Sequence, residues 1–200
     1  MSNLKLFHKK QIEKKFNLGK NNFILITFHP ETLNLEQIKK QLKILFYSIK
    51  KLPFKVIITY PNADPEHIKI INYINKLKEN HENFKVIKNC GRKLYYSLMK
   101  HTKLMIGNTS SGIVEAASFR KPVINLGIRQ MGKIKPKNVI DCKITLKSIN
   151  NALKTALSEK FTRSISRIKN PYQPKIPLKK FCNLIINTKL DKKLIRKKLY

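Results

Sequence analysis

Long apolar runs and an N-terminal apolar segment are both missing from this 200-residue sequence. The longest apolar runs, at 23–26 and 56–58, are strand-sized and far below the roughly 20 residues that a membrane-spanning helix needs. We therefore expect no membrane span. The first ten residues lack the apolar stretch of about 7–15 residues found in secretory signals, so a cytoplasmic location is expected.

Cysteine and histidine patterns typical of bridged or metal-binding proteins are also lacking. The three cysteines are odd in number and widely separated: Cys90, Cys142 and Cys182. This spacing excludes a disulfide framework and argues against a zinc site. The five histidines show neither an H-x-x-x-H nor an H-E-x-x-H pattern. We expect reduced thiols, no metal ligands and no cofactor.

Acidic residues are scarce, since 11 Asp and Glu stand against 43 Lys and Arg, giving a formal charge of +32. Such a potential attracts RNA, acidic lipid headgroups or an anionic substrate. The lysines, however, are spread over every predicted helix, as a coding bias toward Lys, Asn and Ile would also produce. The densest basic segment, 189–198, is a tail without interleaved stacking aromatics. Nucleic-acid binding is therefore disfavoured, and a basic RNA-binding protein stays an alternative.

The residues that are present predict a folded α/β domain. Hydrophobic residues make up 42% of the sequence, which is enough for a sizeable core. From residue 22 onward, short apolar runs alternate with helical patterns, as is typical of β-α units and a doubly wound, Rossmann-like parallel sheet. The predicted strands are 23–28, 55–60, 84–87, 104–106, 123–125 and an edge strand at 139–141.

Helical periodicity fills the segments between these strands. Asn34 with Gln37 resembles a capping box for a helix that ends before Pro53. Asp64 is the expected N-cap of the next helix, which runs to about Asn80. Further helices are predicted near 94–100, 113–119, 148–160 and 178–186. The expected organisation is a helical linker at 1–21, a Rossmann-like domain at 22–165 and a basic helical tail at 166–200.

The most informative segment, 107–119, lies between a strand and a helix at the carboxyl edge of the sheet, where open α/β folds bind ligands. Small hydroxyl residues and Gly112 let backbone N–H groups approach a phosphate, whose charge the helix N-terminus favours. A diphosphate fits this turn, although helix capping also explains Ser110 and Ser111. Glu115, placed in the first helical turn, either binds ribose hydroxyls or simply complements the helix dipole.

Several segments together resemble a known family. They are 27–32, which contains His29-Pro30-Glu31-Thr32, the turn at 61–64, the loop at 107–115, the string 122–133, and the turn at 170–172. In this order they resemble the hydrolysing UDP-N-acetylglucosamine 2-epimerases of sialic and related nonulosonic acid synthesis. The string 122–133 is the most specific, because chance matches to so long an ordered string are improbable. The match covers only the second of the two Rossmann-like domains in this glycosyltransferase-B-type (GT-B) architecture.

The resemblance implies the chemistry and the residues that perform it. In the family, UDP is eliminated to leave a 2-acetamidoglucal, and water then adds to give N-acetylmannosamine. His29 matches the histidine that faces the diphosphate and helps UDP depart, although a lone histidine after a strand is more often structural. Ser110, Ser111 and Gly112 match the residues that hold the diphosphate. Glu115 matches the group placed for the ribose.

Three more residues complete the implied UDP site. Arg129 matches an arginine near the nucleotide and sugar, where its cationic fork can hold phosphate oxygens. Asn62 belongs to the turn after the second strand. Tyr96 aligns in spacing with an aromatic that packs on uracil, and a place on an apolar helix face would also explain it.

The resemblance also implies partners. The family's N-terminal half supplies acidic residues for proton transfer at the sugar, so we expect this chain alone to be inactive on its UDP-sugar substrate. That half would be a separate chain or would be missing, and a homo-oligomer is a further expected assembly. The nucleotide-binding half of a GT-B glycosyltransferase is the alternative with the same fold. The segment 127–132 favours the epimerase.

Overall fold

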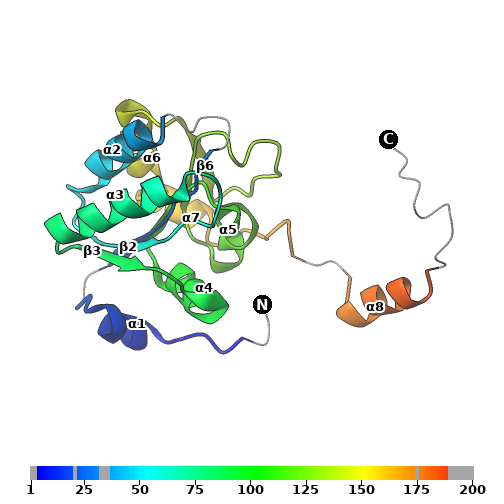
Figure 1. Ribbon diagram of the computed structural model, residues 1–200. Helices are drawn as coiled ribbons and strands as arrows, with labels where there is room; N and C mark the ends of the chain where they lie inside the picture. The colour runs from blue at the N-terminus through cyan, green and yellow to red at the C-terminus, as the bar shows by residue number, and fades with distance from the viewer. Residues whose placement is uncertain (1–3, 20–21, 32–36, 174–175, 189–200) are drawn as a thin grey trace.

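The computed structural model describes residues 4–19, 22–31, 37–173 and 176–188. Its centre is a six-stranded sheet in which all neighbouring strands are parallel, in the order β3-β2-β1-β4-β5-β6 (Figure 1). The predicted doubly wound sheet is thus confirmed. The strands are β1 (Phe23–Thr27), β2 (Lys55–Thr59), β3 (Phe84–Ile87), β4 (Leu104–Gly107), β5 (Val123–Leu126) and β6 (Val139–Cys142).

Helices cover both faces of this sheet. One face packs against α2 (Ile38–Ile49), α3 (His67–Asn80) and α6 (Leu146–Ala156). The other packs against α1 (Lys9–Phe16), α4 (Gly91–His101) and the 3₁₀ helix η2 (Ala116–Phe119), which follows the short helix α5 (Ser110–Val114). The remaining helices are α7 (Glu159–Ser164) and α8 (Leu178–Ile186).

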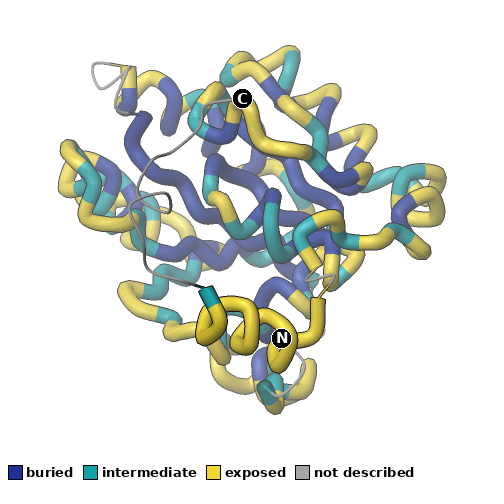
Figure 2. Tube along the Cα trace, turned by 90° about the vertical axis from the view of Figure 1, so that its right-hand side faces the viewer, coloured by how far each residue is buried: buried dark blue, intermediate teal, exposed yellow. Residues whose placement is uncertain are grey.

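The strand sequences explain why two cores form. Side chains alternate across a strand, so Ile24 and Ile26 of β1 enter one core while Phe23 and Leu25 enter the other. All five residues of β1 are buried, as expected for a central parallel strand covered on both faces. Figure 2 shows the strands buried between helices whose outer surfaces are exposed.

The expected N-cap of α3 is wrong. The helix begins at His67 after Glu66, which adopts a left-handed conformation with φ 66° and makes no side-chain cap. Asp64 instead forms an ion pair with Arg129, which comes from the opposite side of the sheet's central strand. A long-range charge partner therefore replaced a local capping bond. Asn34 and Thr32, used in the capping and family patterns, lie outside the described residues.

The expected helix at 113–119 is also revised. Helical backbone begins earlier, at Ser110, and the chain changes to a 3₁₀ helix at Ala116. Glu115 is therefore the C-cap of α5 and does not lie in its first turn. Glu115 is also the N-cap residue of η2, where its side chain makes no capping hydrogen bond.

The helices near the two ends of the chain, α1 and α8, differ in whether they pack against the core of the domain. Ile12 and Leu18, near α1, are 1% exposed and belong to the core on the α4 side. At the other end, the expected helix 148–160 is two helices, because Ser158 caps α7 separately. Beyond it, α8 stands away from the sheet (Figure 1). Among the described helices, none has the length and apolar character to cross a membrane.

Candidate functional site

A cleft of about 420 Å³ opens at the carboxyl edge of the sheet. It lies where β1, β2 and β4 end, which is the edge that the sequence pattern predicted for ligand binding. Its walls come from segments far apart in the sequence. The lining includes Thr27, His29, Thr59, Asn62, Tyr95, Tyr96, Thr109, Ser110, Ser111 and Arg129.

Six of the eight predicted site residues therefore line one cleft. A neighbouring hollow of about 350 Å³ shares Ser110 and Arg129 with it and adds Asp64, Gln130 and Lys133. The two hollows together form a continuous polar surface along the same sheet edge. A further hollow of about 230 Å³ lies at the opposite edge, where β2 and β3 begin, and contains none of the predicted residues.

The other two predicted residues, Gly112 and Glu115, lie just behind the cleft wall. A Cβ atom at Gly112 would come 3.0 Å from Cγ1 of Val123, so glycine allows α5 to pack closely on β5. Glu115 is half-buried, and its Oε2 is a buried oxygen without a hydrogen-bond partner in the described structure. Burial raises the pKa of Glu115, which its own backbone N–H and Lys133 partly oppose.

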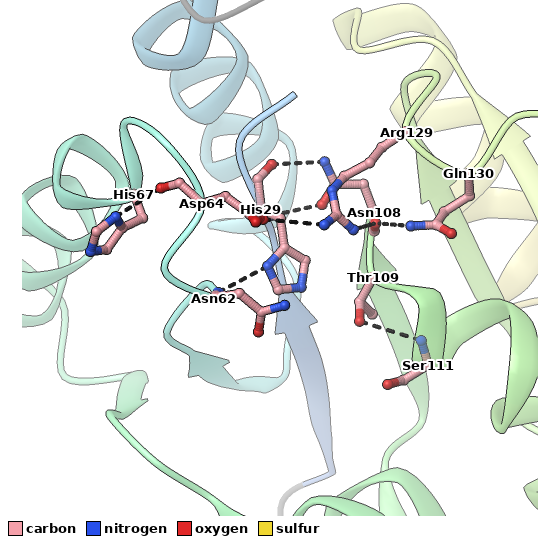
Figure 3. A network of polar contacts seen from close by, with 9 residues as sticks. All are labelled: His29, Asn62, Asp64, His67, Asn108, Thr109, Ser111, Arg129 and Gln130. Carbon is pink, nitrogen blue, oxygen red and sulfur yellow. Dashed lines mark hydrogen bonds and ion pairs between the residues drawn. The ribbon is translucent and has the colours of Figure 1, made fainter. Parts of the chain in front are cut away.

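His29 is fixed in one tautomer at the cleft. It is 4% exposed, and its Nδ1 accepts a hydrogen bond of 3.1 Å from the backbone N–H of Asn62 (Figure 3). In a neutral imidazole, this bond assigns the proton to Nε2. Burial and then the Arg129 charge lower the pKa of His29 to about 4, with Asp64 partly opposing them. The neutral ring is therefore a hydrogen-bond donor at neutral pH.

Asn108 joins the loop after β1 to the loop after β4. Its Oδ1 accepts the backbone N–H of His29 at 2.7 Å, and its Nδ2 donates to the backbone oxygen of His29 at 2.9 Å. Asn108 is completely buried, so both bonds form in a site without competing water. The amide thus fixes the backbone that carries the histidine. Asn108 was not among the predicted site residues, although its place between Gly107 and the hydroxyl turn at 109–111 could have indicated it.

Arg129 is held by the same region. Its Nη2 donates to Oδ2 of Asp64 at 3.2 Å and its Nη1 donates to the backbone oxygen of Asn108 at 3.3 Å (Figure 3). That oxygen also accepts from Nε2 of Gln130 at 2.8 Å. The guanidinium is only partly exposed, with 27% of its side chain accessible. Its position is thus set before any ligand arrives.

Glu31 anchors the backbone of the segment that carries Arg129. Its Oε1 accepts the N–H groups of Ile128 at 2.9 Å and Arg129 at 3.3 Å. Gly127 has φ 69°, and a Cβ atom there would collide with the Glu31 carboxylate. A glycine is therefore required both by the backbone conformation and by the close approach of this acid. Glu31, which the sequence showed only as part of the motif 29–32, thus fixes the backbone next to Arg129.

The turn before α5 is shaped by short-range contacts. Thr109 is its N-cap, and its Oγ1 accepts the N–H of Ser111 at 3.4 Å. Gly107 has φ 147° and lies so close to the backbone of Thr27 that no Cβ atom would fit. The hydroxyl turn consequently lies directly beside the end of β1. Tyr96 borders it from α4 and packs against Phe119, with 6.0 Å between ring centroids.

The chemistry of this cleft suits a phosphorylated ligand. A fixed cation, a neutral imidazole donor and a hydroxyl turn at a helix start provide directed donors for oxyanions. In the described part of the chain, no three His, Cys, Asp or Glu side chains gather as a metal-binding group. The chain is thus a Rossmann-like domain with a cleft at the carboxyl edge of its sheet, and the lining of that cleft carries hydrogen-bond donors of the kinds that suit oxyanions.

The comparison with known sequences assigns the family. Residues 1–185 match the family model described as UDP-N-acetylglucosamine 2-epimerase, so the chain belongs to this family. It is 36% identical over 168 residues to the GDP/UDP-N,N'-diacetylbacillosamine 2-epimerase (hydrolyzing) of Campylobacter jejuni. The alignment covers 82% of this chain and 43% of that protein. A Legionella pneumophila UDP-N,N'-diacetylbacillosamine 2-epimerase (hydrolyzing) is 31% identical over 68% of this chain and 36% of its own length.

Solved structures show the same fold. The UDP-GlcNAc 2-epimerase of Neisseria meningitidis bound to UDP-GlcNAc matches with a TM-score of 0.70 at 22% identity, covering 90% of this chain and 49% of that one. The UDP-GlcNAc 2-epimerase of Methanocaldococcus jannaschii in complex with UDP-GlcNAc and UDP gives 0.69 at 19% identity, with shares of 90% and 49%. The chain thus has the GT-B-like fold of these enzymes and spans less than half the length of the relatives described here.

Proposed function

We propose that this chain is the UDP-binding half of a hydrolysing UDP-N-acetylglucosamine 2-epimerase. It would support the conversion of UDP-N-acetylglucosamine to UDP and N-acetylmannosamine. The observation that carries the proposal is the convergence of His29, Arg129 and the Ser110–Ser111 turn on one cleft at the carboxyl edge of the sheet. Related enzymes of known structure hold UDP or UDP-GlcNAc and have the same fold, which supports this reading.

The diphosphate is the best-supported part of the proposed ligand. Ser110 and Ser111 would donate hydroxyl or backbone N–H groups to phosphate oxygens, and Gly112 keeps α5 close to the sheet behind them. Arg129 would contribute a charge-assisted donor from the other side of the cleft. Because the guanidinium is already held by Asp64 and Asn108, little side-chain entropy would be lost on binding.

His29 would act when UDP leaves. Breaking the bond between the sugar C1 and the diphosphate oxygen moves an electron pair onto that oxygen, while a base removes the proton from C2. The Nε2–H of His29 would donate to the oxygen as negative charge develops there. Ligand phosphates would also raise the pKa of His29 from about 4, because they favour the charged imidazolium.

The nucleoside would occupy the outer part of the cleft. Tyr96 would provide an aromatic surface there for uracil, and Asn62 lines the same cleft. Glu115 is assigned to the ribose, because it bears an unpartnered carboxylate oxygen beside Tyr96. A ribose hydroxyl would satisfy this oxygen, although reaching it requires a small opening of the wall, since Glu115 does not line the cleft in the unliganded structure.

An N-terminal half is the proposed partner. The proton transfers at the sugar need acidic side chains that this cleft does not bring together, whereas the relatives are more than twice as long as the matched segment. The described chain also has a surface suited to a partner, because α8 exposes Leu178, Phe181 and Leu184 together. A cytoplasmic location and a homo-oligomer belong to the same proposal.

Thermal unfolding with UDP tests the nucleotide site directly. A ligand that binds only the folded state stabilises it by mass action, so UDP should raise the melting midpoint of the purified chain. Inorganic pyrophosphate should raise it less, because it lacks uracil and ribose contacts. An unchanged midpoint at millimolar UDP, with folding shown by circular dichroism, would contradict the proposal. Salt-sensitive binding of generic RNA in its place would favour the basic RNA-binding alternative.

A further inference from the structure

A turn beyond α7 lies against the junction of α5 and η2. It consists of Asn170, Pro171, Tyr172 and Gln173, and so contains the family-like segment 170–172. The backbone N–H of Gln173 donates to the backbone oxygen of Asn170 at 3.1 Å, which closes a β-turn with Asn at its first position and Pro at its second. Oδ1 of Asn170 also accepts the N–H of Tyr172 at 2.9 Å. The local sequence therefore fixes the turn and leaves the Nδ2 group of Asn170 for contacts elsewhere.

That Nδ2 group binds two acceptors that lie 56 and 52 positions away along the chain. It donates to the backbone oxygen of Val114 at 2.7 Å and to Oγ of Ser118 at 2.7 Å. A side-chain amide nitrogen carries two hydrogens, so both bonds can form at once. Val114 is the last residue of α5, and Ser118 lies in η2. Asn170 thus joins the end of one helix to the helix that follows it.

Glu115 lies between these two points of attachment. Its backbone N–H donates to the backbone oxygen of Ser111, and its backbone oxygen accepts from the N–H of Ser118, both at 3.0 Å. The peptide group before Glu115 is the one whose oxygen Asn170 binds. The Glu115 side chain is half-buried, and its Oε2 is a buried oxygen without a hydrogen-bond partner in the described structure. The backbone that carries this unpartnered carboxylate is therefore held on both sides.

We propose that Asn170 is a positioning residue for Glu115 and thereby contributes to recognition of the ribose of a nucleotide. This inference rests on the proposed function of the cleft. Asn170 lines neither of the two hollows at this edge of the sheet, and it is assigned no contact with the ligand. Its effect passes through the peptide group between Val114 and Glu115.

The geometry of the junction explains why such a restraint matters. A carboxylate binds a ribose hydroxyl only when its oxygen lies within hydrogen-bond reach and the bond is well aligned. Rotation of the peptide group before Glu115 would move that oxygen, because the side chain leaves the backbone at the next Cα atom. An α-helix and a 3₁₀ helix have different hydrogen-bond spacing, so no single ladder continues from α5 into η2. Asn170 restrains this junction from outside both helices.

Asn170→Ala in the full chain tests the role, with the dissociation constants of UDP and of inorganic pyrophosphate measured by calorimetry. We expect the dissociation constant of UDP to rise about two- to tenfold, which corresponds to the loss of one hydrogen bond. Pyrophosphate has no ribose, so its dissociation constant should not change. In a Glu115→Ala background, Asn170→Ala should have almost no additional effect on UDP binding, because the carboxylate that it positions is gone.

Asn80→Ala is the matched control. Nδ2 of Asn80 donates to the backbone oxygen of Lys76 at 2.7 Å, at the end of α3 and at the opposite edge of the sheet. This substitution removes the same kind of bond, and UDP binding should not change. If Asn170→Ala does not fold, Ser118→Ala removes one of the two acceptors from an exposed residue. It should weaken UDP binding by a smaller factor and leave pyrophosphate binding unchanged.

Four outcomes overturn the inference. They are unchanged UDP affinity in Asn170→Ala, or in Ser118→Ala where that variant replaces it, an equal loss of affinity for pyrophosphate, equal losses in the wild-type and Glu115→Ala backgrounds, and a matching loss in Asn80→Ala. An equal loss for pyrophosphate would mean that Asn170 holds α5 in general and has no particular effect on ribose binding. A wild-type chain that does not bind UDP would instead reject the proposed function, which separates the two failures.

Discussion

The carboxyl edge of the sheet and helix α8 show opposite relations between polarity and burial. At the sheet edge, the polar residues Asn108 and His29 are 0% and 4% exposed and have hydrogen-bond partners. In α8, the apolar residues Leu178 and Ile186 are 76% and 77% exposed. Buried polar groups are costly unless paired, and an exposed apolar helix face gains free energy when covered.

This difference separates polar groups that are paired within the chain from an apolar surface that the described chain leaves uncovered. The cleft groups are held by Asn108, Glu31 and Asp64, all from this chain, so the proposed UDP site has its side chains in fixed positions. Nothing comparable fixes the apolar side of α8 in the described structure, where all residues of the helix are exposed (Figure 2). The proposed division into a UDP-binding half and a partner half follows this contrast.

The largest expected effect concerns turnover. Alone, the chain should not consume UDP-N-acetylglucosamine, while a mixture with a complementary N-terminal half should release UDP and N-acetylmannosamine. In that mixture, His29→Ala should lower turnover about 10²–10⁴-fold, as is typical when a general acid or base is lost. UDP release in a coupled assay measures this, with His101→Gln as the control because His101 binds the backbone of Phe7 outside the cleft.

Two results would contradict the proposed division into a UDP-binding half and a partner half. Turnover by the isolated chain would show that the proposed N-terminal half is not needed for the chemistry. Full activity of His29→Ala in a working mixture would reduce His29 to a structural residue.

The next effect is a loss of stability in mild acid. The pKa of His29 is about 4 in the folded chain and about 6.5 when unfolded, so the unfolded state takes up the proton first as the pH falls. The stabilisation is complete above pH 6.5 and is lost progressively toward pH 4. By pH 5 it should have decreased by about 2 kcal/mol. Urea unfolding of the wild type and His29→Gln should show a smaller pH dependence for the variant. Equal pH dependence would contradict the buried, neutral histidine.

Arg129→Ala should weaken UDP binding roughly tenfold or more, because a charge-assisted hydrogen bond contributes about 1.5 kcal/mol or more. Its effect on the melting midpoint without UDP should be small, since the side chain is partly exposed and lies outside the apolar cores. Arg163→Ala is the control, because Arg163 pairs with Glu159 on exposed α7. Equal UDP affinity in both variants would show that the cation site is misplaced.

The smallest expected effect is on stability and concerns the exposed apolar side chains of α8. Leu184→Ala should change the free energy of unfolding of this chain by under about 0.5 kcal/mol, because the side chain is 62% exposed. Leu98→Ala in α4 should cost about 2–5 kcal/mol, because Leu98 is completely buried. Urea titrations of both variants measure the difference. A large loss in Leu184→Ala would show that α8 is covered within this chain or by a second copy.

The order of elements followed from the sequence because it depends on local patterns. Strand-sized apolar runs and helical periodicity located all six strands and the helix at 178–186. The resemblance through 122–133 also led to the correct family, as the family match confirms. The roles of the cleft residues, by contrast, remain predictions that the experiments above address.

Where sequence reasoning failed, a contact distant along the chain had replaced a local preference. Asp64 resembles an N-cap, yet a fixed arginine 65 positions later is its partner. Glu115 resembles a first-turn acid, yet it lies between the end of α5 at Val114 and the start of η2 at Ala116. Local propensities are weak compared with such tertiary interactions.

The sequence by itself determined the β-α alternation, the hydroxyl turn and the family. These features depend on periodicity and on motifs whose residues lie close together along the chain. Only the tertiary structure decided that Asn108, Glu31 and Asp64 would hold the groups at the cleft, and that the hydroxyl of Tyr95 would lie 3.1 Å from that of Thr27. Those side chains meet because parallel strands bring their carboxyl ends to one edge. Their spacing along the chain follows neither the helical nor the strand period, so the sequence pattern does not predict that they meet.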